Sequence, residues 1–179
     1  SREMKADRDI ALVACSSNGT AIQHASWTFR DDDELMTVAV RQHGGALIYA
    51  SPRLKASKQL ALLACKVHGY ALGCVGDALR GDRELVEVAL AQNGLVLQHV
   101  AEPLKSDISI QMMALRQNGR ALEYASDALR RDREVVLAAV SLHGRALQFA
   151  AAELRDDREV VLAAVAQDAW ALLHVSDAL

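Results

Sequence analysis

The sequence has few aromatic residues, no paired cysteine motif and no long apolar run, and each shortage excludes a class of protein. Aromatic residues make up only 4% of the chain although hydrophobic residues make up 51%, so its apolar residues are mainly alanine, leucine and valine, which suit closely packed helices. The odd set Cys15, Cys65 and Cys74 lacks a Cys-x-x-Cys spacing, which argues against a disulfide framework and favours a reducing, intracellular compartment. No apolar stretch approaches the roughly 18 residues that span a bilayer, so we expect no membrane insertion.

The chain also lacks a large excess of positive or of negative charge. The formal net charge is −3, and the lysines and arginines are interspersed with aspartates and glutamates. Nucleic-acid-binding proteins usually gather basic residues on one face, so this pattern argues against an electrostatic grip on nucleic acid or on an anionic membrane.

The chain instead has a strict internal period of 25 residues, with no insertion. Seven repeats begin at Asp7, Asp32, Ser57, Asp82, Asp107, Asp132 and Asp157. We number the positions of each repeat from 1 to 25. Residues 1–6 match positions 20–25 of a preceding repeat, so we interpret residues 1–179 as a single repeat array, a slice of a longer solenoid. We expect flanking repeats or neighbouring chains to cover its ends.

Each repeat predicts one longer and one shorter helix. The aspartate at position 1 is a helix N-cap, and the glycine at position 13 stands where a left-handed residue would end a helix of about eleven residues. Position 8 is alanine in all seven repeats, so neighbouring helices are expected to pack closely there. An apolar anchor at position 23, from Phe29 to Leu179, closes the shorter element, which is either α or 3-10. The predicted fold is an all-α solenoid of tandem helix-turn-helix repeats.

This pattern resembles the repeats of the domain-of-unknown-function 4116 family. The resemblance rests on Asp132, Ala139, Gly144, Ala146, Leu147 and Leu154, whose equivalents recur together at fixed spacing over nearly the whole chain. Ser57 and Ala169 depart from the pattern, at the opening aspartate and at the glycine. The resemblance implies long arrays, found in bacteria and in unicellular eukaryotes, and it brings no catalytic residue with it.

The histidines do not predict a metal or catalytic site. All six fall at positions 12 and 18, where they alternate with Asn, Tyr, Phe and Cys, so we interpret them as polar residues at a helix end and as half-buried flat side chains. The nearest approach to a ligand cluster is Cys65 and His68 with His43 of the preceding repeat, but Cys65 occupies an apolar position. The glycines fall singly, without a phosphate-binding loop. We expect no catalytic, cofactor-binding or metal-binding residue.

Position 24 is basic in all six complete repeats, which raises the alternative of a nucleic-acid-binding array. A simpler interpretation places these residues near a helix C-terminus, in ion pairs with nearby acids. A second alternative is a targeting region of a multidomain effector or enzyme.

The variable positions 2, 6, 10, 14 and 17 are the ones that the fold does not require, so they are expected to face solvent. Large apolar residues there are candidates for binding a protein partner: Tyr70, Leu95, Ile108 and Trp170. The preferred hypothesis is a non-catalytic protein-interaction or scaffold module, within a longer protein or a larger assembly, whose partner the sequence does not name.

Overall fold

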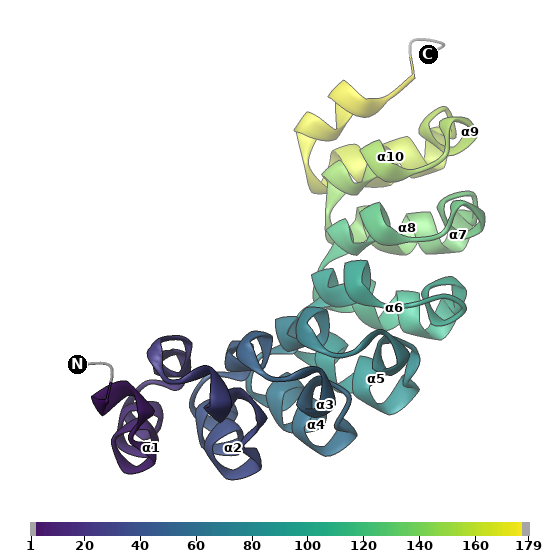
Figure 1. Ribbon diagram of the computed structural model, residues 1–179. Helices are drawn as coiled ribbons and strands as arrows, with labels where there is room; N and C mark the ends of the chain where they lie inside the picture. Colours follow the sequence, from purple (N-terminus) through teal and green to yellow (C-terminus); the bar gives the residue numbers. More distant parts are fainter. Residues whose placement is uncertain (1–2, 177–179) are drawn as a thin grey trace. The chain divides into compact units, whose positions relative to one another are not determined.

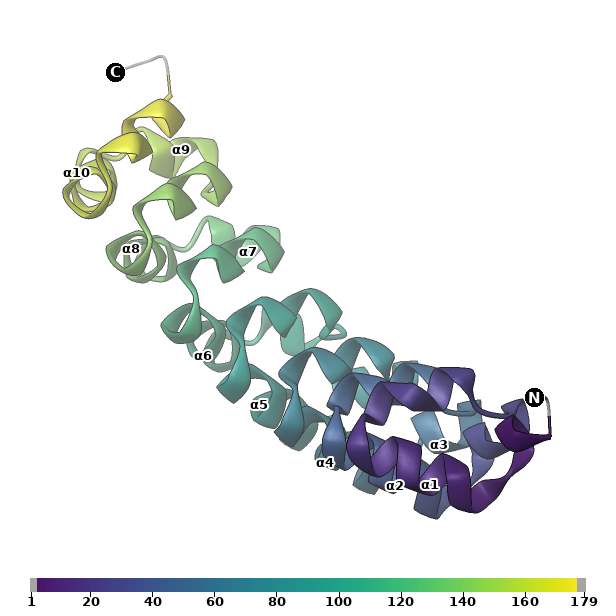
Figure 2. The same cartoon turned by 90° about the vertical axis from the view of Figure 1, so that its left-hand side faces the viewer.

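The computed structural model describes residues 3–176, and within this range the regular secondary structure is helical, without a strand. The chain divides into two compact parts, residues 1–92 and 93–179, here called the N-terminal half and the C-terminal half. In each half the long helices of consecutive repeats pack side by side, as Figures 1 and 2 show. The predicted all-α solenoid of tandem repeats is confirmed.

Each repeat contains one α-helix of ten residues, over positions 2–11. In the N-terminal half these are α1 (Arg8–Ser17), α2 (Asp33–Gln42), α4 (Lys58–Val67) and α5 (Arg83–Gln92). In the C-terminal half they are α6 (Ile108–Gln117), α8 (Arg133–Leu142) and α10 (Arg158–Gln167). The predicted N-caps are confirmed: the Asp132 carboxylate, for example, accepts hydrogen bonds from the amides of Glu134 and Val135. Ser57 keeps the same geometry, because its hydroxyl accepts from the Leu60 amide at 3.4 Å.

The shorter element is a 3-10 helix of six residues that begins at position 13. The seven examples are η2 (Gly19–His24), η4 (Gly44–Tyr49), η5 (Gly69–Cys74), η7 (Gly94–His99), η9 (Gly119–Tyr124), η10 (Gly144–Phe149) and η11 (Ala169–His174). A further short turn of helix then leads to the next repeat. These turns are η1 (Met4–Ala6), η3 (Trp27–Asp31), α3 (Pro52–Lys55), η6 (Asp77–Gly81), η8 (Leu104–Ser106), α7 (Asp127–Arg130) and α9 (Ala152–Arg155).

The core is built from the same columns in both halves. The alanines at position 8 are fully buried from Ala39 to Ala164, as are the aliphatic residues at position 16 from Ile22 to Leu147. Small residues at position 8 let neighbouring backbones approach closely, as the sequence predicts. At the anchor position Leu54 and Leu129 are buried, whereas Leu179 lies outside the described residues.

The glycines at position 13 have a different role from the predicted one. None has a positive φ, and the preceding residue already ends the long helix in an extended conformation, with His43 at φ −150°. A Cβ at Gly44 would stand only 2.3 Å from the carbonyl oxygen of Ala64 in the next repeat. The same approach of 2.1–2.8 Å occurs at Gly19, Gly44, Gly69, Gly94, Gly119 and Gly144. Position 13 is therefore glycine because the next helix leaves no room for a side chain, not because a left-handed residue is needed.

Main-chain hydrogen bonds also tie consecutive repeats together. The amide at position 20 donates to the carbonyl at position 24 of the preceding repeat, as from Ser51 to Arg30 at 2.7 Å and from Ala151 to Arg130 at 3.0 Å. Backbone contacts therefore hold the stack together alongside the buried side chains.

Candidate functional site

The four residues predicted to bind a partner lie on separate elements. Tyr70, Leu95 and Trp170 each follow the first residue of a 3-10 helix, and Ile108 opens α6. Trp170 is 63% exposed and Ile108 51% exposed, whereas Leu95 is only half-buried. None of the four lines any of the hollows described below. As a group they do not form one binding site.

A hollow of about 620 Å³ lies instead in the N-terminal half, between η3 and the segment from η4 to α3. Its lining includes Trp27, Ile48, Tyr49 and Pro52, and we call it the Trp27 hollow. Trp27 is 77% exposed and Ile48 is 54% exposed. An exposed tryptophan beside an exposed isoleucine at the rim of a hollow is the arrangement typical of an anchor for a protein partner.

The sequence contains a signal for this hollow at positions 17 and 21 of the repeat. Position 21 carries Trp27 where other repeats have residues such as Asp77 and Asp127, and position 17 carries Ile48 where others have residues such as Gln98. Both are therefore apolar departures in mostly polar columns. The four residues predicted to bind a partner lie at positions 2 and 14, so Trp27 and Ile48 are not among them.

Polar contacts fix the rim of the Trp27 hollow. The Tyr49 hydroxyl donates to Gln23 at 2.9 Å. Arg53 donates to Asp31 at 2.9 Å and to Asp33 at 2.7 Å, and Ser51 also donates to Asp31. The hydrogen bond from Ser51, and then that from Arg53, lowers the pKa of the Asp31 carboxyl. The polar side chains of the rim are thus held in place by one another.

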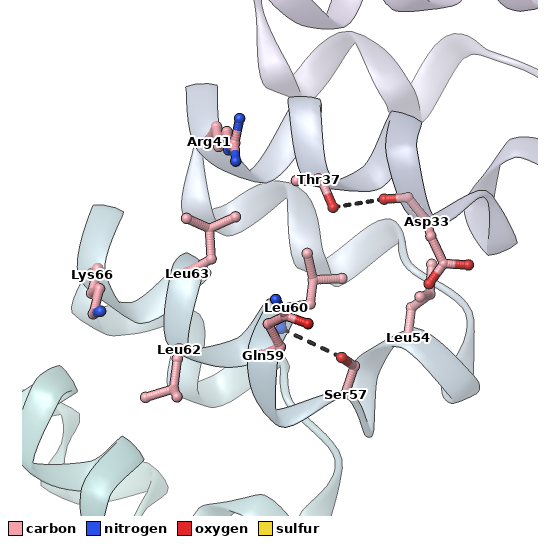
Figure 3. A pocket seen from close by; sticks show the side chains of 10 residues that line it. All are labelled: Asp33, Thr37, Arg41, Leu54, Ser57, Gln59, Leu60, Leu62, Leu63 and Lys66. Carbon is pink, nitrogen blue, oxygen red and sulfur yellow. Dashed lines mark hydrogen bonds between the residues drawn. The ribbon is translucent and has the colours of Figure 1, made fainter.

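A second groove, of about 430 Å³, separates α2 from α4 (Figure 3). Leu54 and Leu60 are buried at its base, and Leu63 is half-buried along its wall. Figure 3 also shows Arg41 and Lys66 on the two helices that border it. This groove has no aromatic side chain in its lining, so the Trp27 hollow is the better candidate for an anchoring site.

Position 2 takes part in an ion-pair ladder between repeats, although the sequence predicts a solvent-facing position without a structural role. Arg8 bridges Asp32 at 2.8 Å and Glu34 at 2.6 Å, the acids at positions 1 and 3 of the next repeat. Lys58 bridges Asp82 and Glu84 in the same way, and Arg133 bridges Asp157 and Glu159. The pKa of the Asp32 carboxyl is lowered, first by the hydrogen bond from Arg8.

Repeats 2 and 5 have no basic residue at position 2. In repeat 2 position 2 is acidic, Asp33, and the next repeat carries Ser57 and Gln59 where acids would stand. In repeat 5 position 2 is Ile108, and among residues 3–176 the acids of the next repeat, Asp132 and Glu134, have no ion pair.

The model of the family described as Domain of unknown function (DUF4116) matches residues 32–80, 82–130 and 132–179. The chain belongs to the DUF4116 family. Each match covers two consecutive 25-residue repeats, and repeat 1 lies outside the matched segments. No curated protein and no solved structure matches the chain.

In this DUF4116 array two members of the basic column at position 24, Arg80 and Arg130, hold backbone carbonyls. Arg130 donates to the backbone carbonyls of Glu123 and Ala125, at 2.6 and 3.1 Å, and Arg80 donates to that of Gly73 at 3.1 Å. These carbonyls lie at or near the end of the 3-10 helices, where they lack partners within the helix. The interpretation of this column as cations near a helix C-terminus is therefore confirmed for Arg80 and Arg130.

Position 12 also contributes to the DUF4116 fold, as the sequence predicts. The side chain of Asn118 accepts from the Arg120 amide at 3.0 Å and so caps η9, and Asp168 caps η11 in the same way. His68 accepts through Nδ1 from the Gly44 amide at 3.1 Å, and its ring lies 4.5 Å from that of His43. Within residues 3–176 no three His, Cys, Asp or Glu side chains are grouped so that they could hold a metal ion.

The cysteines of the DUF4116 array are thiols set into or against the core. Cys15 and Cys65 are buried and Cys74 is half-buried. Burial raises the pKa of all three thiols, that of Cys65 to about 12. At neutral pH they are therefore protonated and weakly nucleophilic.

In the part of the chain that the structure describes, no helix has both the length and the apolar character needed to cross a membrane.

Proposed function

We propose that this DUF4116 array is a non-catalytic scaffold that binds a protein partner and that the Trp27 hollow anchors that partner. One observation carries the proposal: Trp27 is 77% exposed at the rim of a hollow that Ile48 and Tyr49 also line. A tryptophan with a purely structural role is usually well buried. Binding hot spots, in contrast, are enriched in tryptophan, tyrosine and arginine. Arg53, whose guanidinium donates to Asp31 and Asp33, fixes part of the lining of the same hollow.

The alternative of a nucleic-acid-binding array has less support. Phosphate binding requires basic side chains that are available to the ligand. In this chain Arg8, Lys58 and Arg133 are engaged by acids of the next repeat, and Arg80 and Arg130 by backbone carbonyls. The other alternative, a targeting region of a multidomain effector or enzyme, is compatible with the same hollow, because such a region also works by binding.

A peptide library displayed on phage and selected on the intact chain tests the proposal. Dissociation constants of the selected peptides are then measured by fluorescence polarisation on the wild type, on Trp27→Ala and on Leu142→Gln. Leu142 is an exposed leucine of the C-terminal half in a column that is glutamine in four repeats, so its substitution is the matched control. Loss of a hot-spot tryptophan costs at least about 2 kcal/mol, so we expect about 30-fold weaker binding for Trp27→Ala and none of this loss for the control.

Two outcomes would contradict the proposal. One is selected peptides that bind Trp27→Ala as tightly as the wild type, although circular dichroism shows both proteins folded. The other is tight binding of single-stranded RNA or DNA that weakens steeply between about 50 and 200 mM salt, since that dependence indicates phosphate contacts.

A further inference from the structure

The columns that form the Trp27 hollow also form a hollow in the C-terminal half. This second hollow, of about 260 Å³, lies between α7 and the segment from η10 to α9. It is lined by positions 21, 24 and 25 of repeat 5 and by positions 17–20 and 24 of repeat 6, and the same columns of repeats 1 and 2 line the Trp27 hollow. Its lining contains three arginines, so we call it the arginine hollow: Arg130, Arg131 and Arg155.

The arginine hollow differs from the Trp27 hollow in its charge. At position 25 the Trp27 hollow has Asp31, which forms an ion pair with Arg53. The arginine hollow has Arg131 there, although the other complete repeats have Asp, Ala, Gly or Ser in this column. At position 21 the arginine hollow has the exposed Asp127 in place of Trp27. Three arginines and one aspartate leave an excess of two positive charges in the lining.

None of the three guanidinium groups forms an ion pair with another side chain of residues 3–176. Arg130 donates to the backbone carbonyls of Glu123 and Ala125, which hold it in place but do not neutralise its charge. Arg155 occupies the same column of the next repeat, but its Nε is buried and has no hydrogen-bond partner in the described part of the chain. A buried donor without an acceptor costs free energy, and an anion in the hollow would supply acceptors for this guanidinium group.

We propose that the arginine hollow binds the phosphoryl group of a phosphorylated side chain on a protein partner. Arginine forms bidentate, charge-assisted hydrogen bonds with phosphate, and clustered arginines are a common means of recognising phosphorylated segments. A phosphorylated side chain carries about −1.5 to −2 charges at neutral pH, which matches the excess charge of the lining better than the single charge of a carboxylate does.

The surroundings of the hollow favour a phosphorylated protein over a nucleic acid. A nucleic acid presents a row of phosphates and is bound by basic residues that follow its backbone. Here the three arginines gather in one hollow, and the nearby Arg133 is engaged by Asp157 and Glu159. The inference shares a protein partner with the proposed function, but it uses a different site, in the other half of the chain.

Two degenerate peptide libraries test the proposal on the intact chain. One has a central phosphoserine between randomised positions, the other has serine in its place, and both carry a fluorophore for fluorescence polarisation. We expect the phosphoserine library to bind at least about ten-fold more tightly, because hydrogen bonds to charged groups are stronger than those to neutral groups. Inorganic phosphate should displace the phosphoserine library, and sodium chloride at equal ionic strength should displace less of it.

Substitutions assign this binding to the hollow. Arg131→Gln and Arg155→Gln should each weaken binding of the phosphoserine library at least about ten-fold. Arg116→Gln is the matched control, because Arg116 is exposed on α6 and lies outside the lining, yet its substitution removes the same charge. Circular dichroism checks that each variant is folded, and the exposed position of Arg131 keeps the test valid if Arg155→Gln fails to fold. Trp27→Ala should bind the phosphoserine library as the wild type does, so failure of one site can be distinguished from failure of the other.

Three results would overturn the proposal. The first is equal binding of the two libraries. The second is binding of the phosphoserine library by folded Arg131→Gln and Arg155→Gln as tight as that by Arg116→Gln. The third is tighter binding of single-stranded RNA of mixed sequence than of the phosphoserine library, together with loss of the RNA binding in Arg131→Gln, since the hollow would then serve a nucleic acid.

Discussion

Gly144→Ala tests the packing argument at a single interface, the one between repeats 6 and 7. The added Cβ would meet the Ala164 carbonyl oxygen at 2.4 Å and the Asp168 amide nitrogen at 3.0 Å, although ordinary van der Waals contact begins at 3.4 Å. These atoms form the last hydrogen bond of α10, at 2.9 Å. The substitution should therefore loosen α10 and η11 while the other repeats keep their structure.

The expected magnitude comes from two opposed effects. Overpacking of this kind costs about 1–3 kcal/mol. The lower backbone entropy of alanine in the unfolded chain offsets about 0.4–1 kcal/mol of that cost. A net destabilisation of up to about 2.6 kcal/mol remains. Because each repeat of a solenoid contacts only its neighbours, the loss should fall on repeat 7.

Hydrogen exchange read by mass spectrometry, together with thermal unfolding, measures the effect. Amides of α10 and η11 should exchange faster in Gly144→Ala, and those of α6 should be unchanged. Gly76→Ala is the control, because a Cβ there would be no closer than 3.6 Å to its nearest neighbour, the Lys55 carbonyl oxygen. It should leave the protein as stable as the wild type or slightly more stable. Equal exchange and equal melting temperatures for the two variants would refute the argument.

Three further substitutions test other parts of the fold. Gln111→Met should stabilise the protein by about 1–3 kcal/mol in urea unfolding, because Gln111 is fully buried and its amide has no hydrogen-bond partner; the exposed Gln117→Met should not do so. Ala114→Leu should destabilise it by roughly 1–3 kcal/mol through overpacking, and an unchanged melting temperature would contradict this expectation. Arg133→Gln should reduce the acid sensitivity of unfolding. The pKa of Asp157 is lowered chiefly by Arg133, so its stabilising effect is present above the unfolded pKa of about 3.9 and is lost as the pH falls through the lower folded pKa. Equal pH profiles for wild type and variant would argue against the ion pair.

Much of the fold could be predicted from the sequence because it depends on residues that lie within a single repeat. The N-cap aspartates, the alanine column and the end of each long helix follow from the residues of one repeat. The reason for the glycines could not be predicted, since it lies in the backbone of the next repeat. A glycine at a helix end usually indicates a left-handed residue, but here the chain is extended and the missing Cβ makes room for Ala64 and its equivalents.

The candidate site could be predicted only in part, for a related reason. The variation of position 2 among repeats predicts a solvent-facing position without a structural role. Arg8, however, pairs with acids 24 and 26 residues later in the sequence, which only the stacking of repeats brings near. Trp27 and Ile48 were open to prediction, since each is apolar in a mostly polar column. The volume of the hollow between them depends on how η3 and η4 pack, and no single repeat encodes that packing.

The ion-pair ladder gives the repeats a preferred order. A repeat with arginine or lysine at position 2 forms ion pairs when the next repeat has acids at positions 1 and 3. Repeat 2 has Asp33 at position 2, and the next repeat has the uncharged Ser57 and Gln59 at those positions, so no like charges meet. Exchange of repeat 2 with repeat 1 would place Asp33 beside the acids of another repeat and would place Arg8 where it finds none. Duplication or shuffling of whole repeats would keep the 25-residue period. The charges at positions 1, 2 and 3 would nevertheless favour some neighbouring repeats over others, and in this way they help to set the order of the repeats.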